Sequence, residues 1–130
     1  MTAAKAGNFA IWLVIMLLSV GVGGYALYLV ATGFAAMPLQ NPMLAPYGLQ
    51  VHVAASGVAM LVGAFQFFKP LRARVPTLHR WIGRIYVVAC VIGGVAGGII
   101  ALSSNAGPIA GWGFLTLALL WVPFTLLALR

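Results

Sequence analysis

The sequence predicts an all-α membrane protein, a bundle of four transmembrane helices. Of its 130 residues, 64% are hydrophobic and 5% are charged, and none is Asp or Glu. A soluble domain is about a quarter charged, so this composition excludes the soluble globular class. It also excludes intrinsic disorder, which requires low hydrophobicity. The apolar residues fall into four runs, each close to the roughly 20 residues that cross a bilayer.

The four runs cover residues 9–34, 47–68, 81–102 and 111–129. Lipid cannot satisfy backbone hydrogen bonds, so each run is expected to be a helix. Thr77 is the expected N-cap, and the third helix is therefore expected at about 78–102. The first run has 26 residues, whereas a signal-peptide core has roughly 7–15. We therefore expect an uncleaved anchor and a single membrane domain over residues 1–130.

The positive charges predict the orientation. Lys5 precedes the first run, Arg130 follows the last, and the connections 35–46 and 103–110 are uncharged. The remaining cations lie between the second and third runs: Lys69, Arg72, Arg74, Arg80 and Arg84. Because Lys and Arg favour cytoplasmic loops, both termini and this basic connection are expected in the cytoplasm. The abundance of Ala, Gly and Arg favours a bacterial inner membrane.

The basic connection has two interpretations. Each cation near an anionic leaflet contributes about 1 kcal/mol, so these five residues are candidate contacts for an acidic phospholipid. Alternatively, they are a topology signal without a specific ligand. Nucleic acid is not an expected partner, because the cations flank apolar runs and do not form one face of a soluble fold.

Small residues recur at four-residue spacing along two of the expected helices. They are Ala55, Ala59 and Gly63 in the second helix, and Gly93, Gly94, Gly97 and Gly98 in the third. Such rows allow helix backbones to approach closely. They indicate either packing within one bundle or an interface with another membrane protein.

His52 is the candidate cofactor-binding residue. It lies about one turn into the second helix, and Ser56 follows four residues later on the same face. A polar residue at this depth usually faces the bundle interior and is a functional candidate. It fits a haem b or quinone contact, a proton-relay group, or a packing residue. His79 is expected at the opposite membrane face, so the two histidines cannot ligate one iron.

Other polar residues suggest no catalytic centre. Gln66 is expected to bond to a neighbouring helix or to the basic connection. Cys90 is expected to be a buried packing residue, and a lone cysteine excludes a Cys-rich metal site. Without any carboxylate, no Asp- or Glu-based acid/base pair exists in this stretch. Neither a catalytic residue nor a metal site is predicted.

A motif opens the third helix: His79 and Arg80, then Gly83 and Arg84, then Tyr86. Together with His52 and the run at 63–67, it resembles the bacterial membrane-protein family catalogued as domain of unknown function 2306, over roughly residues 47–130. The resemblance implies a helical membrane fold and no activity. Family members typically continue with a second His-Arg-x-Trp motif and further helices. This chain is therefore expected to be either C-terminally truncated or a short variant.

Three functional hypotheses follow. The first is a non-catalytic accessory subunit of a respiratory or photosynthetic membrane complex, without a cofactor of its own. It rests on the small-residue rows and on the uncharged connection at 35–46, which is rich in Pro and Met. The second is a haem- or quinone-binding redox module that uses His52. The third, a small-molecule or lipid carrier, rests on the basic connection and on Pro123 in the fourth helix.

Overall fold

The computed structural model describes residues 3–35, 45–103 and 106–128, and this part of the chain is helical without strands. The four long helices are α1 (Ala3–Ala31), α2 (Gln50–Gln66), α4 (Pro76–Ala101) and α5 (Pro108–Leu127). Two short elements precede α2 and α4: a π-helical turn, η1 (Ala45–Leu49), and α3 (Lys69–Arg74). These described residues include four helices that are long and apolar enough to cross a membrane. The predicted all-α membrane fold is confirmed.

Prolines mark two helix starts. α4 begins at Pro76 and α5 at Pro108. Proline suits the first helical position, where its missing N–H has no intrahelical partner in any case. The N-cap of α4 is Val75, and no side chain caps this end. The prediction of Thr77 as the N-cap was therefore wrong, because the helix starts one residue before it.

The basic connection contains a helix that the sequence did not predict. Phe68 is extended, and the six residues of α3 follow it with a proline in the first turn. The Val75 N–H then donates to the Leu71 carbonyl at 2.9 Å, at the end of α3. The connection is thus a short helical bridge between α2 and α4, and its cations have defined positions.

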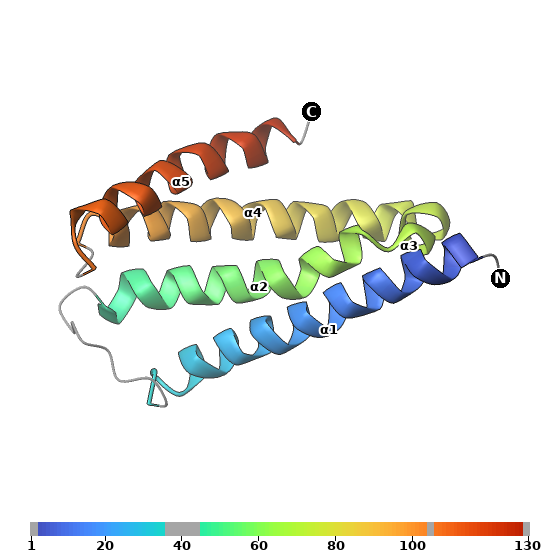
Figure 1. Cartoon of the computed structure of the whole chain (residues 1–130), viewed down its shortest axis with the longest axis horizontal. Coiled ribbons are helices and arrows are strands. Elements are labelled where there is room, and N and C mark those ends of the chain that lie inside the picture. The colour runs from blue at the N-terminus through green and yellow to red at the C-terminus, as the bar shows by residue number, and fades with distance from the viewer. Residues whose placement is uncertain (1–2, 36–44, 104–105, 129–130) are drawn as a thin grey trace.

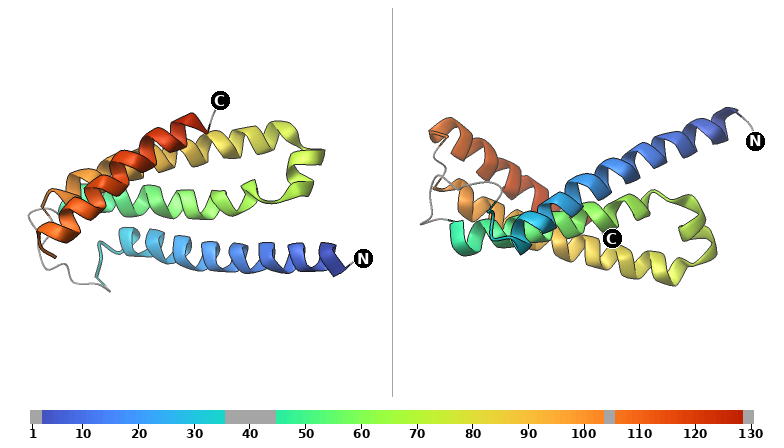
Figure 2. Two further views of the ribbon diagram at one scale, coloured as in Figure 1. Left: turned by 45° about the horizontal axis from the view of Figure 1, so that its top comes forward. Right: turned by 90° about the horizontal axis from the view of Figure 1, so that it is seen from below.

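The long helices pack in the order of the chain. α1 packs on α2, α2 on α4 and α4 on α5 (Figure 1). Among the described residues, α1 makes no close backbone contact with α4 or α5, and α2 makes none with α5. The helices therefore form an open row, with α2 and α4 in the middle. Figure 2 shows α1 and α5 crossing this central pair at an angle.

Trp12 links α1 to α2 through a hydrogen bond and a ring contact. The Trp12 indole N–H donates to the Ala64 carbonyl at 3.1 Å, and its ring stacks on Phe68 with centroids 4.5 Å apart. Farther along, Gly23 lies so close to α2 that a Cβ there would be 2.9 Å from the Gly57 carbonyl oxygen. The α1–α2 contact thus combines a hydrogen bond with close backbone packing.

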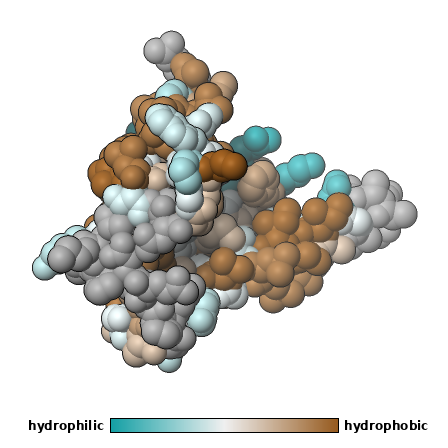
Figure 3. Space-filling model, turned by 60° about the vertical axis from the view of Figure 1, so that its left-hand side comes forward, coloured by the Kyte–Doolittle hydropathy of each residue, from teal (hydrophilic) through white to brown (hydrophobic). Residues whose placement is uncertain are grey.

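The outer surfaces are apolar. No residue of α5 is buried, and Ile109 is 91% exposed. Figure 3 shows hydrophobic residues over most of the helix surfaces in that view, with strongly hydrophilic residues in only a few places. The start of α1 and the cationic α3 lie at one end of the row, and the ends of α1 and α4 lie at the other (Figure 1). That the α3 end faces the cytoplasm stays a prediction.

Candidate functional site

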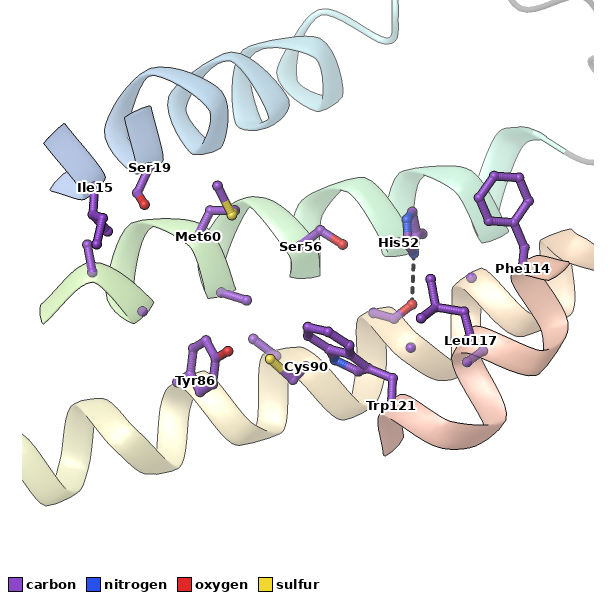
Figure 4. Close-up of a pocket in the computed structure, with 18 of the residues that line it drawn as sticks. Ile15, Ser19, His52, Ser56, Met60, Tyr86, Cys90, Phe114, Leu117 and Trp121 are labelled. Carbon is purple, nitrogen blue, oxygen red and sulfur yellow. Dashed lines mark hydrogen bonds between the residues drawn. The ribbon is translucent and has the colours of Figure 1, made fainter. Parts of the chain in front are cut away.

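A cavity of about 580 Å³ lies among the four long helices (Figure 4). This volume falls within the roughly 300–1,000 Å³ that is usual for small-molecule sites. Its wall is mostly apolar and includes Ile15 from α1 and, from α5, Phe114, Leu117 and Trp121. The outer helices α1 and α5 do not contact one another among the described residues, so the cavity is partly open between them.

Five polar side chains from three of the long helices line this cavity. They are Ser19 from α1, His52 and Ser56 from α2, and Tyr86 and Cys90 from α4. Cys90 is buried, as predicted. Inside a membrane, polar groups are costly when they face lipid and normally line an interior or a functional site. Their convergence makes this cavity the candidate site.

His52 is fixed by a hydrogen bond to α4. Its Nδ1 lies 2.8 Å from the Gly93 carbonyl oxygen (Figure 4). Because a carbonyl only accepts, Nδ1 must carry the proton, and in the neutral ring Nε2 keeps the lone pair. The described residues provide no hydrogen bond to Nε2. His52 therefore offers an acceptor to a ligand hydroxyl, or a nitrogen ligand to a metal.

Glycines of α4 make room for the polar residues of α2. A Cβ on Gly97 would lie 2.8 Å from Nδ1 and 2.9 Å from Cε1 of His52. A Cβ on Gly93 would lie 3.3 Å from the Ser56 hydroxyl and 3.5 Å from the Ala55 methyl group. Because Gly93 and Gly97 have no side chains, His52 and Ser56 can pack directly against α4.

The other small residues also contact helices of this chain. Gly94 faces Val122 of α5, and a Cβ on Gly98 would lie 3.2 Å from the Ala118 methyl group, also on α5. Gly63 faces the Tyr86 ring. The remaining member, Ala59, lines the cavity. These contacts support packing within the chain. A partner interface at the same residues stays a prediction.

The motif residues connect α2 to α4 near α3. The Gln66 side-chain amide donates to the His79 carbonyl in a long hydrogen bond of 3.5 Å, as predicted for a bond to a neighbouring helix. A Cβ on Gly83 would lie 3.3 Å from Oε1 of Gln66. Gln66 follows His52 by 14 residues on α2, a rise of about 21 Å. His79 is therefore at the far end of α2 from His52, and the two cannot share one iron.

The predicted lipid-contact residues lie at the α3 end. All five are exposed: Lys69, Arg72, Arg74, Arg80 and Arg84. The Arg84 guanidinium lies 4.8 Å from the centre of the Trp81 ring. The Lys5 side chain, Arg130 and the stretch 36–44 of the Pro- and Met-containing connection lie outside the described residues. No group of three His, Cys, Asp or Glu side chains that could hold a metal occurs in the described part of the chain.

His52 and Ser56 lie on one face of α2 at the cavity, as predicted, but the cavity residues from the outer helices α1 and α5 were not predicted. Ile15, Phe114, Leu117 and Trp121 are apolar residues in apolar helices. A residue facing a cavity and one facing lipid have the same hydrophobic character in a membrane protein. No sequence signal distinguishes these residues from their neighbours.

Comparison with known proteins identifies a family without a described activity. No curated protein and no solved structure matches the chain. The family model described as "Predicted membrane protein (DUF2306)" matches residues 49–130, which include α2, α3, α4, α5 and most of the cavity lining. This match covers more than half of the chain, and it includes the motif from His79 to Tyr86. The chain belongs to the DUF2306 family of predicted membrane proteins.

Proposed function

We propose that this chain is a multi-pass membrane module that binds an apolar molecule with a hydroxyl-bearing head group, of the quinol class. The observation that carries the proposal is the convergence of His52, Ser56 and Tyr86 on one mostly apolar cavity between the helices. A site of this kind binds a ligand by burying its apolar part and orienting it through a few polar contacts.

The His52 tautomer sets which head group fits. Since Nδ1 donates to Gly93, Nε2 accepts a hydrogen bond from a quinol hydroxyl but provides no proton for a quinone carbonyl. The Ser56 hydroxyl serves either form, because it both donates and accepts. One additional net hydrogen bond contributes about 0.5–1.5 kcal/mol, so the reduced form is expected to bind roughly 2- to 10-fold more tightly.

The haem version of this hypothesis has less support. Electron-transfer haems such as those of cytochromes c use two protein ligands. Among the described residues, His52 is the single histidine at the cavity, since His79 lies near the opposite end of α2. Quinol binding needs only the acceptor that His52 provides.

A second candidate function is the accessory subunit of a larger membrane complex. The open row supports it, because α1 and α5 each pack on one helix of the described chain and leave the cavity partly open. Partner helices with an apolar surface would cover that opening. The bacterial inner membrane is the proposed location for both functions. A small-molecule carrier would use the same cavity.

The test of the first proposal is ligand binding by the purified chain in lipid nanodiscs. Decylubiquinol and decylubiquinone are titrated while tryptophan fluorescence is recorded, because Trp121 lines the cavity. His52→Ala is expected to weaken quinol binding roughly 2- to 10-fold, because it removes the hydrogen bond that Nε2 accepts from the quinol. His79→Ala is the matched control, since it removes the other histidine near the far end of α2, and it is expected to bind quinol as the wild type does. Equal quinol affinity of the wild type and His52→Ala contradicts the proposal.

The accessory-subunit candidate is tested by mild-detergent extraction from native membranes. Migration with a large assembly and co-purification of stoichiometric membrane subunits would support it. Migration as a small particle would contradict it and leave the binding proposal unaffected.

A further inference from the structure

We propose that the α3 end of the molecule holds an acidic phospholipid on the outer face of α4, with the headgroup phosphate between Arg80 and Arg84. The proposal is independent of the cavity. The sequence contains seven Lys and Arg residues and no Asp or Glu. No cation in this chain therefore has a side-chain carboxylate to pair with, and both arginines are exposed.

The position of Arg84 along α4 sets its depth in the membrane. Arg84 follows the start of α4 at Pro76 by eight residues, a rise of about 12 Å. The whole helix has 26 residues, about 39 Å, and a centred helix of this length extends about 4–5 Å beyond each side of a 30 Å hydrocarbon layer. The Arg84 backbone is therefore several Å inside the hydrocarbon. A charged side chain that starts at this depth must extend toward the headgroups.

The contact with Trp81 shows the direction of the Arg84 side chain. The Arg84 guanidinium lies 4.8 Å from the centre of the Trp81 ring, and Trp81 is three residues nearer the start of the helix. Tryptophan favours the membrane interface. The side chain thus points back along α4 and holds its charge at interface level. Arg80, four residues earlier, lies on the same helix face. Guanidinium groups bind phosphate oxygens through paired hydrogen bonds.

The outer face of α4 also provides a surface for acyl chains. Below Arg84 the helix presents exposed apolar residues at helical spacing: Ile85, Val88, Ile92, Val95 and Ile99. This stripe continues the face of Trp81 and Arg84 toward the membrane centre. A phospholipid would contact both parts of this face, with its phosphate at the two arginines and its acyl chains along the apolar stripe. A free phosphate ion would contact only the two arginines. The ligand is therefore a phospholipid.

The experiment is native mass spectrometry of the chain released from nanodiscs that contain equal amounts of phosphatidylglycerol and phosphatidylcholine. The wild type is expected to retain phosphatidylglycerol preferentially. The variant Arg80→Gln/Arg84→Gln is compared with Arg72→Gln/Arg74→Gln, which removes the same number of charges from α3. Each arginine that hydrogen-bonds to the phosphate changes affinity at least about fivefold, and the α3 arginines make no such contact in the proposed site. The α4 variant is therefore expected to lose on the order of twentyfold in retained phosphatidylglycerol, and the α3 variant much less.

Three results would overturn the proposal. Equal losses in the two double variants would show general attraction to the negative membrane surface. Displacement of the lipid by millimolar inorganic phosphate would show a free-anion site. A wild type without preference between the two lipids would show no acidic-lipid site.

Trp81→Leu keeps every charge and removes the ring beneath Arg84, so it tests the site if the α4 double variant fails to insert. It is expected to reduce phosphatidylglycerol retention two- to fivefold, and unchanged retention counts against the proposal.

Discussion

The glycines of α1 and of α4 both cluster in the sequence but have different surroundings in the structure. In α4, each of Gly93, Gly94, Gly97 and Gly98 has a neighbouring helix where its side chain would be. In α1, Gly23 contacts α2 closely, whereas a Cβ on Gly21 or on Gly24 would meet nothing within 4 Å. The difference arises because α4 packs on two helices and α1 on one. A glycine cluster therefore indicates close packing only on a face that has a neighbour.

The largest effect is expected at Gly23. A Cβ in Gly23→Ala would lie 2.9 Å from the Gly57 carbonyl oxygen, and a backbone atom cannot rotate away. The two helices must separate slightly, at a cost of about 1–3 kcal/mol of unfolding free energy. Reversible unfolding in mixed detergent measures it. A Gly23→Ala protein as stable as the wild type would contradict the close α1–α2 packing.

The next effect is expected at Gly97. Gly97→Ala forces the His52 ring away from α4 and breaks its hydrogen bond to Gly93, at a cost of about 1 kcal/mol. In a His52→Ala background the same substitution has no ring to displace and is expected to be nearly neutral. A double-mutant cycle in the unfolding assay measures this coupling. If the free-energy losses of the two single variants simply add in the double variant, Gly97 does not provide the space for the His52 ring.

A smaller effect is expected at Gly94. A Cβ in Gly94→Ala would lie 2.8 Å from Cγ2 of Val122, and this methyl group belongs to a side chain on an outer helix that can adjust. We expect a loss of less than about 1 kcal/mol, below the usual cost of overpacking, and Val122→Ala is expected to restore the stability. The unfolding free energies of the two single variants and the double variant check this. Failure of Val122→Ala to restore stability would contradict the assigned α4–α5 contact.

The smallest effect, of opposite sign, is expected at Gly24. Since the position is open, Gly24→Ala meets no neighbour and gains helix propensity of up to about 1 kcal/mol. An unfolding free energy equal to or above that of the wild type agrees with the structure. Destabilisation similar to that of Gly23→Ala would remove the distinction between the two positions.

The fold was largely predictable because lipid requires each apolar run to satisfy its own backbone hydrogen bonds. The boundaries were less predictable, since Pro76 and Pro108 begin helices that hydropathy alone places later. α3 was missed because its basic residues suggested a loop. The open row was not predictable either, because hydropathy identifies spans and does not show which spans contact one another.

The candidate site was predictable only in its polar part. His52 and Ser56 stand out as polar groups in an apolar run, and their four-residue spacing puts them on one face. The bond from His52 to Gly93 depends on the register between α2 and α4, which sequence spacing within one helix does not contain. Trp121 reaches the cavity only because of how α5 crosses α4.

The open row also has a consequence for biosynthesis. Each long helix packs on the one inserted before it, α2 on α1, α4 on α2 and α5 on α4. Contacts of this order join segments close in sequence, and low contact order favours rapid folding. Trp12, for example, finds its acceptor at Ala64 as soon as α2 has entered the membrane. The described helices are therefore suited to assembly one by one during translation, without waiting for α5.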